Sequence, residues 1–173
     1  MITVYASKWL PPHIQRQSRD MRVRWALEEA GLDYRATLLS FDDQKAQPYK
    51  DLQPFGQIPA YEEDGLNLFE SGAILLHVAG KTPVLAPEDP AAYARMTCWM
   101  FAALNSIEPY VQNLAIIDFF NADQEWAKLR RPEALAFAER RLDTLADRLK
   151  DRDYLEEGFT AAFGGGRRDE EKA

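Results

Sequence analysis

The chain has 173 residues, of which 46% are hydrophobic and 12% aromatic, so it can bury a core as one domain or as two small ones. Its formal net charge of −7, without a clustered basic patch, excludes nucleic acid as a partner. Cys98, His13 and His77 give neither an internal disulfide nor a metal-ligand pattern. The start lacks a signal-peptide pattern, and no stretch approaches the ~18 apolar residues that would span a membrane, so we expect a cytoplasmic protein.

The first 40 residues alternate between strand and helix signals. The run ITVY at residues 2–5 is β-branched and aromatic, which is typical of a strand. In MRVRWALEEAG, residues 21–31, apolar side chains recur at helical spacing and Gly31 offers a C-cap. YRATLL, residues 34–39, has strand character again. The chain therefore opens as β-α-β.

The next segment combines a weak helix signal with a strong hairpin signal. DQKAQPYKDL, residues 43–52, predicts a weak helix that Pro48 interrupts. PAYEEDGLNLFE, residues 59–70, holds two short strands around an Asp64-Gly65 turn. Two antiparallel strands are therefore expected here.

A compact apolar helix and a proline-rich segment follow the hairpin. We expect Ser71 to cap the helix GAILLHVAG, residues 72–80, which ends in Gly80. The predicted order up to this point is β-α-β-α-β-β-α. KTPVLAPEDP, residues 81–90, carries three prolines and predicts a linker between two domains.

From residue 91 onward the hydrophobic period is helical throughout. Apolar side chains step by three and four in two runs, Tyr93, Met96, Met100, Ala103, Ile107, Val111 and Leu114, then Leu135, Ala138, Leu142, Leu145 and Leu149. This predicts two long helices, one over residues 91–118 and a second that starts at Pro132 after the short helical lead-in QEWAKLRR. Stripes with this spacing are core or partner surface rather than a cofactor site.

Two dipeptides between residues 58 and 71 carry the ligand chemistry. An X-Pro bond readily takes the cis form, so Ile58-Pro59 could turn the chain sharply and leave the Ile58 N–H and C=O free to pair with an extended peptide. Glu70 and Ser71 lie where a strand gives way to a helix. The Ser71 hydroxyl and the free helix N–H groups would bind a carboxylate, while Glu70 would bind an ammonium. The alternative interpretation is that Pro59 is only a turn residue and Ser71 only an N-cap.

This pattern resembles the cytosolic glutathione transferase family over about residues 1–160. The most specific part is GQIPA followed by LFESGAI, and RVRWALEEAGLDY on the first helix supports it. The resemblance implies a thioredoxin-like α/β domain at residues 1–80, a linker at residues 81–90 and an incomplete all-α domain at residues 91–163. The family typically dimerises through its helices, so a homodimer is expected.

The resemblance also assigns a glutathione site residue by residue. Ile58 would pair its backbone with the cysteinyl part of glutathione, just before cis Pro59. Glu70 and Ser71 would hold the γ-glutamyl amine and carboxylate, and Gln57 would reach the glycine end. Glutathione is then a co-substrate, and no further cofactor and no metal are implied.

The group that activates the thiol has three candidates. A thiol with a pKa of about 8.5 is mostly protonated at neutral pH, so a hydrogen-bond donor must favour the thiolate. Members of the family use tyrosine, serine or cysteine after the first strand. Ser18 is preferred, because it precedes the first helix and Arg22 follows four residues on, as in serine-type members. Ser7 and Tyr5 remain alternatives, because the loop before Ser18 is longer than is usual; Ser18 as a simple helix cap is the other interpretation.

Two functions remain open from the sequence. The first is an enzyme that transfers glutathione to a small hydrophobic electrophile bound between the domains, against the helix of residues 91–118. The second is a glutathione transferase-like binding module without turnover. The sequence does not identify the electrophile, because a hydrophobic pocket depends on side-chain geometry.

The end of the chain departs from the family pattern. The family places an Asp at the position of Phe163, where it closes a reciprocal capping box with a threonine. Three glycines and a charged segment follow, a composition that does not bury enough apolar surface to offset its ordering entropy. We therefore expect residues 164–173 to be disordered and the chain to be a C-terminally truncated member of reduced stability and activity.

Overall fold

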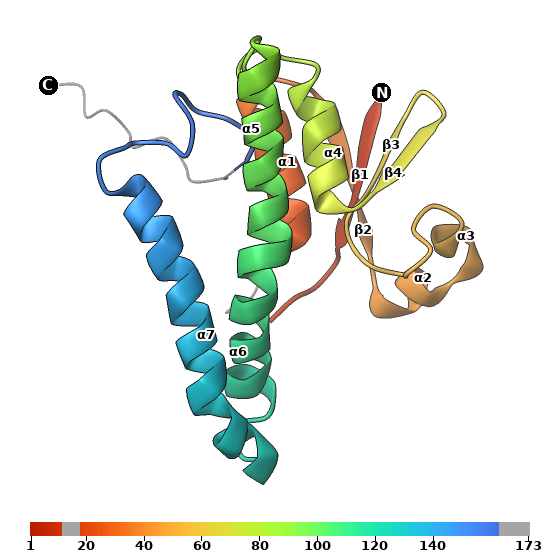
Figure 1. The fold of residues 1–173 in the computed structure, drawn as a ribbon. Helices are drawn as coiled ribbons and strands as arrows, with labels where there is room; N and C mark the ends of the chain where they lie inside the picture. The colour runs from red at the N-terminus through yellow and green to blue at the C-terminus, as the bar shows by residue number, and fades with distance from the viewer. Residues whose placement is uncertain (12–17, 163–173) are drawn as a thin grey trace, which may run out of the picture. The chain divides into compact units, whose positions relative to one another are not determined.

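The computed structural model describes residues 1–11 and 18–162, and the chain divides after Glu88 into two units. The first unit contains all the strands of the described residues, and the second is helical (Figure 1). Phe163 and residues 164–173, for which the sequence predicts a lost capping box and disorder, lie outside the described residues. No helix in the described part of the chain is long and apolar enough to cross a membrane.

The first unit follows the predicted order, with one helix more than expected. Its elements are β1 (Ile2–Ser7), α1 (Arg19–Glu29), β2 (Tyr34–Leu39), α2 (Phe41–Lys45), α3 (Gln47–Lys50), β3 (Ala60–Glu63), β4 (Leu66–Phe69) and α4 (Ser71–Ala79). The weak helix predicted at residues 43–52 is two short helices, because Ala46 between them is extended. Pro48 lies in the first turn of α3, where an N–H has no helical acceptor in any case. The thioredoxin-like α/β class is confirmed.

The sheet has the strand order β2-β1-β3-β4. β1 and β2 are parallel, whereas β3 is antiparallel to both β1 and β4. The predicted hairpin turn is confirmed, because Asp64 and Gly65 both have positive φ, 49° and 86°, as a two-residue turn of this kind requires. The carboxyl ends of β1, β2 and β4 and the start of β3 consequently meet at one edge, which we call the carboxyl edge.

The core of the first unit lies between the sheet and two helices. Ile2, Val4 and Ala6 alternate along β1 and are buried on one face. α1 packs on β1 and on α4 (Figure 1). Val23, Ala26 and Leu27 of α1 are fully buried. Side chains on the opposite face of β1 point away from this core, and the Tyr5 ring there lies 5.6 Å from the Tyr49 ring of α3.

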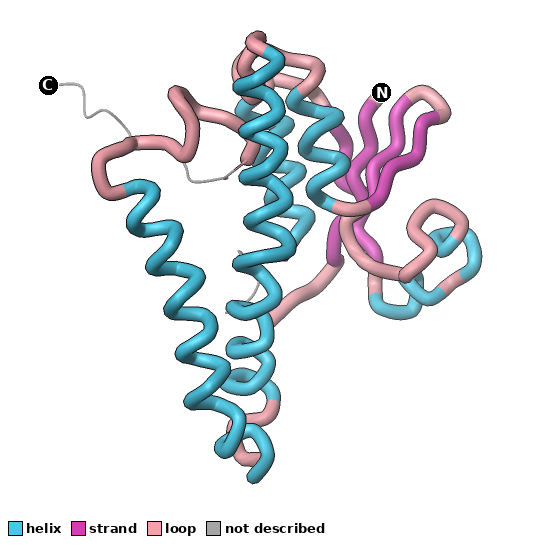
Figure 2. Tube along the Cα trace, in the orientation of Figure 1, coloured by secondary structure: helices cyan, strands magenta, loops and turns pink. Residues whose placement is uncertain are grey.

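The second unit consists of α5 (Pro90–Phe101), a π-helical segment η2 (Ala102–Ile107), α6 (Glu108–Phe120) and α7 (Glu125–Leu149). Figure 2 shows helix continuing from α5 through η2 into α6, so the predicted helix at residues 91–118 is present with a π-helical interruption. Pro109, in the first turn of α6, has no N–H for the helical ladder, and the wider π turn directly before it accommodates this break.

The predicted helix start at Pro132 is wrong. α7 begins at Glu125, and Pro132 lies inside it. Ala127 and Ala134, on either side of the proline, are both buried against Ile117 of α6. Packing on both sides therefore keeps the helix continuous although Pro132 removes one ladder hydrogen bond. The predicted lead-in QEWAKLRR forms the first two turns of α7, apart from its N-cap Gln124.

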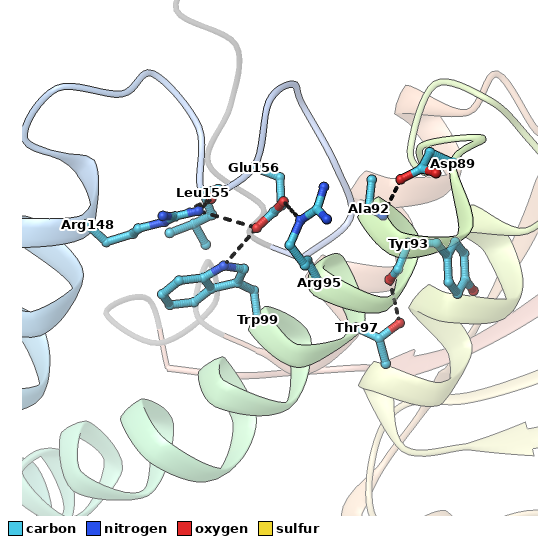
Figure 3. Close-up of polar contacts among 9 residues, drawn as sticks. All are labelled: Asp89, Ala92, Tyr93, Arg95, Thr97, Trp99, Arg148, Leu155 and Glu156. Carbon is cyan, nitrogen blue, oxygen red and sulfur yellow. Dashed lines mark hydrogen bonds and ion pairs between the residues drawn. The ribbon is translucent and has the colours of Figure 1, made fainter.

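A cluster around Glu156 ties the irregular segment after α7 to the helices of the second unit (Figure 3). The buried Glu156 carboxylate accepts from Arg95 Nε at 2.8 Å and from Trp99 Nε1 at 3.1 Å, both on α5. Arg148 of α7 donates to the same carboxylate at 3.4 Å and to the Leu155 carbonyl at 2.6 Å. We call these four side chains, Arg95, Trp99, Arg148 and Glu156, the Glu156 cluster.

Candidate functional site

The register of the sheet brings the predicted ligand segments together at the carboxyl edge. Ala60 at the start of β3 lies opposite Tyr5 of β1 on one side and opposite Phe69 of β4 on the other. Ile58 and Pro59 directly precede Ala60, and Glu70 directly follows Phe69. Segments that are distant in sequence therefore meet within one unit.

The backbone of Ile58 is available to a ligand. The Ile58-Pro59 bond is cis, as predicted. Pro59 is buried and Ile58 half-buried, and within residues 1–11 and 18–162 the Ile58 N–H and C=O have no backbone hydrogen-bond partner. An N–H and a C=O on one residue can pair with an extended peptide in the manner of an added strand.

Two side chains that the sequence did not single out, those of Gln53 and Tyr49, hold the loop before Ile58, and the close approach of Gly56 to Gln44 shapes it. The Gln53 side chain, 2% exposed, accepts from the Gln57 N–H at 3.1 Å, and the Tyr49 hydroxyl donates to the Gln57 carbonyl at 2.6 Å. Gly56 has a φ of +62°, and a Cβ there would lie 2.8 Å from the Gln44 carbonyl oxygen. The backbone of Gln57 is thus fixed, while its exposed side chain remains available.

Glu70 and Ser71 form the second part of the site. Ser71 is the first residue of α4 rather than its cap, because the N-cap position is occupied by Glu70. Glu70 has a φ of +69°, a conformation that costs a residue with a side chain about 1–2 kcal/mol. Backbone strain of this kind is found mainly where a ligand or a switch requires it.

The Ser71 hydroxyl and the start of α4 provide donors. Ser71 is 4% exposed, and its Oγ has no hydrogen bond to any described residue. The Oγ still reaches solvent, because no fully buried side-chain oxygen in the described part lacks a partner. The Ile74 N–H is the first to bond within the helix, to Glu70, so the three N–H groups before it are free of helical acceptors. These donors suit a carboxylate, and the exposed Glu70 carboxylate suits an ammonium.

Two of the three candidate thiol activators donate their hydroxyl protons to carboxylates. The Tyr5 hydroxyl donates to Glu62 at 2.9 Å, and burial, with that hydrogen bond second, raises the pKa of Tyr5 above its ordinary value. Ser18 is the N-cap of α1, yet its side chain makes no capping bond and donates instead to the buried Asp20.

Ser7 differs from both. It is the last residue of β1, half-buried, opposite Leu39 of β2. Its hydroxyl has no hydrogen-bond partner among the described residues. The sequence-predicted residues Ser7, Gln57, Ile58, Pro59, Glu70 and Ser71 are thus gathered by consecutive strand ends at the carboxyl edge.

No group of three or more His, Cys, Asp or Glu side chains in the described part is arranged to hold a metal ion. His77 Nε2 lies 3.5 Å from Glu63 Oε2, and Glu63 is at the end of β3 that is remote from the carboxyl edge.

Comparison with known proteins gives a consistent result. Residues 13–80 match the family "Glutathione S-transferase, N-terminal domain". A glutathione S-transferase of Hyoscyamus muticus is 32% identical in an alignment of length 154 that covers 82% of this chain and 71% of that protein. A crystal structure of a glutathione transferase from Pseudomonas putida, with one glutathione disulfide bound per subunit, has a TM-score of 0.81 at 30% identity and covers 93% of this chain and 70% of that chain. Protein URE2 of Eremothecium gossypii is 29% identical over 60% of this chain and 32% of its own length.

Proposed function

The chain belongs to the glutathione transferase family, and on this premise we propose that it binds glutathione at the carboxyl edge and activates the thiol of glutathione for attack on a small hydrophobic electrophile. One observation carries the proposal. The unpaired backbone of Ile58 lies at the same edge as Glu70 and the free Ser71 hydroxyl, so one edge offers partners for a peptide backbone, an amine and a carboxylate.

Glutathione has these groups in one molecule. The Ile58 N–H and C=O would pair with its cysteinyl backbone, as a peptide pairs with a strand edge. Ser71 and the first N–H groups of α4 would bind the γ-glutamyl carboxylate, and Glu70 the γ-glutamyl amine. The exposed Gln57 side chain would reach the glycine carboxylate.

The binding step is tested by calorimetry with reduced glutathione. Ser71→Ala should weaken binding about tenfold or more, because a hydrogen bond to a charged group contributes about 1.5–3 kcal/mol. Ser71 does not cap α4, so the melting temperature should change little. Ser106→Ala, at an exposed serine of η2, is the matched control and should bind like the wild type. A wild-type protein that gives no binding signal would rule out the site.

A glutathione-binding module without turnover is the second candidate, because the relatives include proteins named URE2 as well as named transferases. The two candidates differ in turnover, not in glutathione affinity. A panel of aromatic halides, epoxides and enones, incubated with glutathione and the protein, distinguishes them. The transferase proposal expects conjugation above the uncatalysed rate with at least one class. Tight binding without conjugation of any of them would favour the module.

We extend the proposal to assembly as a homodimer. Large apolar side chains of the second unit are more than one-third exposed, among them Phe101, Val111, Ile116 and Leu142. Exposed apolar surface of this kind is a typical subunit contact. Light scattering at micromolar concentration should give twice the mass of the chain, and a monomer mass throughout would contradict the dimer.

A further inference from the structure

Both backbone polar groups of Gln57 are bonded to buried side chains from one short stretch of the chain. The Gln57 N–H donates to Gln53 Oε1 at 3.1 Å, and the Gln57 carbonyl accepts from the Tyr49 hydroxyl at 2.6 Å. Gln53 is 2% exposed and Tyr49 is 5% exposed, so these hydrogen bonds are shielded from water and correspondingly strong. We call the side chains of Tyr49 and Gln53 the Gln57 clamp.

The Gln57 clamp is itself held in place by the surrounding structure. The Gln53 N–H donates to the Tyr49 carbonyl at 2.8 Å, and the Gln53 carbonyl accepts from the Gly56 N–H at 3.0 Å. The Tyr49 ring packs on the Tyr5 ring of β1, with 5.6 Å between the ring centroids. Burial holds the pKa of the Tyr49 phenol above its ordinary value, so the hydroxyl keeps the proton that it donates. The clamp therefore connects the sheet to the loop before Ile58.

The direction of the Gln57 backbone decides the direction of the next residue. In extended backbone the N–H and C=O of one residue point to the same side, and those of the next residue point to the opposite side. Ile58 precedes a proline, which favours extended backbone at Ile58. Because the Gln57 groups are bonded to Tyr49 and Gln53, the Ile58 groups point away from the clamp, and they have no backbone partner in residues 1–11 and 18–162. A loop fixed in this way avoids the cost of ordering Ile58 when a ligand binds.

We propose that Tyr49 and Gln53 are positioning residues for the ligand, an assignment that rests on the proposed function. They bond both polar groups of Gln57 and thereby present the Ile58 N–H and C=O to the cysteinyl backbone of glutathione. Neither side chain touches the ligand. Their effect is therefore confined to the part of the ligand that pairs with Ile58, and it does not extend to the γ-glutamyl groups at Glu70 and Ser71.

The test combines a variant of the full chain with a variant of the ligand, measured by calorimetry. Tyr49→Phe removes one hydroxyl and keeps the ring, and it should weaken glutathione binding about three- to tenfold, the equivalent of one neutral hydrogen bond. Glutathione methylated at its cysteinyl amide nitrogen has no N–H for the Ile58 carbonyl. Methylation should weaken binding to the wild type about tenfold or more, and binding to Tyr49→Phe by about threefold less than that, because the two changes remove the same interaction. Tyr34→Phe, which removes a hydroxyl that donates to Glu28, is the matched control and should bind both ligands like the wild type.

Amide hydrogen exchange gives a second measurement that does not depend on the Tyr49 variant. In the free wild-type protein the Gln57 amide should be protected and the Ile58 amide should exchange at least tenfold faster. Added glutathione should slow exchange at Ile58. Gln53→Met, which removes the acceptor of the Gln57 N–H, should speed exchange at Gln57 and weaken glutathione binding.

Three results would overturn the assignment while leaving the proposed function in place. One is unchanged glutathione affinity in Tyr49→Phe. Another is an equal loss of affinity for glutathione and for the methylated ligand, which would give Tyr49 a merely structural role. The third is a Gln57 amide that exchanges as fast as the Ile58 amide in the free protein. A wild-type protein that binds no glutathione rejects the proposed function itself and is recognised before any variant is made.

Discussion

The carboxyl edge of the first unit and the Glu156 cluster of the second unit differ in how their polar groups are paired. At the carboxyl edge, the Ile58 backbone and the Ser7 and Ser71 hydroxyls have no partner among the described residues. In the Glu156 cluster, one buried carboxylate receives donors from three side chains on two helices.

The difference separates binding from stability. A polar group that reaches solvent and has no partner within the protein is hydrated, so it remains available to a ligand. A fully paired buried cluster fixes local structure, and the loss of its central member leaves several donors without an acceptor. The same distinction appears inside the first unit, where Glu63 at the far end of β3 accepts from Tyr61, His77 and Lys81.

The largest expected effect is on stability, through the Glu156 cluster, whose polar groups are paired. Glu156→Ala should lower the free energy of unfolding by about 3 kcal/mol, because Trp99 Nε1 and two guanidinium groups lose a buried acceptor. Glu157→Ala, at the exposed neighbouring residue, is the matched control. Urea denaturation measures both. Equal stabilities for the two variants would show that the Glu156 cluster is not a stabilising feature.

The second effect tests the loop that holds the unpaired Ile58. Gly56→Ala should lower stability by about 2 kcal/mol and glutathione affinity by tenfold or more, because a Cβ would lie 2.8 Å from the Gln44 carbonyl oxygen. Gly65→Ala is the control, with a φ of +86° but no atom within 4 Å of the added Cβ. It should show the cost of positive φ alone and leave affinity unchanged. If calorimetry finds the same affinity in both variants, the loop does not position the site.

The smallest expected effect concerns pH and the paired group at the far end of the sheet. The hydrogen bond from Lys81, then those from Tyr61 and His77, hold the pKa of Glu63 at about 2, below its ordinary value of 4.5. A depressed carboxyl pKa stabilises the fold above pH 4.5, and the contribution is lost as pH falls from about 4.5 toward 2. With solvent screening we expect it to be about 1–2 kcal/mol.

Glu63→Gln measures that contribution. Thermal melts from pH 6 to pH 2.5 should show a variant that is less stable than the wild type at pH 6 and approaches it at pH 2.5. Glu88→Gln, at an exposed residue, should follow the wild type at every pH. A constant difference between Glu63→Gln and the wild type across the range would mean that ionisation of Glu63 does not contribute.

The sequence by itself predicted most elements of the first unit and the segments that meet at its carboxyl edge, but not the division of the helix at residues 43–52 into α2 and α3. The Asp64-Gly65 turn, the helix end before Gly31 and the turn at Ile58-Pro59 all depend on local backbone chemistry, which neighbouring residues specify. Glu70 and Ser71 were singled out for the same reason, since a strand that passes into a helix leaves N–H groups free wherever it occurs. The exact cap was missed, because Glu70 takes a positive φ that its side chain does not favour.

Only the tertiary structure decided which groups at the site are free and which are paired. Ser18 and Ser7 are both serines near the first strand, and the sequence does not tell which hydroxyl is paired. In the structure the Ser18 hydroxyl donates to the buried Asp20, whereas Ser7 lies at the end of β1 opposite Leu39 of β2 and its hydroxyl has no partner among the described residues. Pro132 likewise signals a helix start locally, but packing of α7 on α6 keeps the helix intact around it. Burial and hydrogen-bond pairing depend on residues brought together from distant parts of the chain, and spacing along the sequence does not record those contacts.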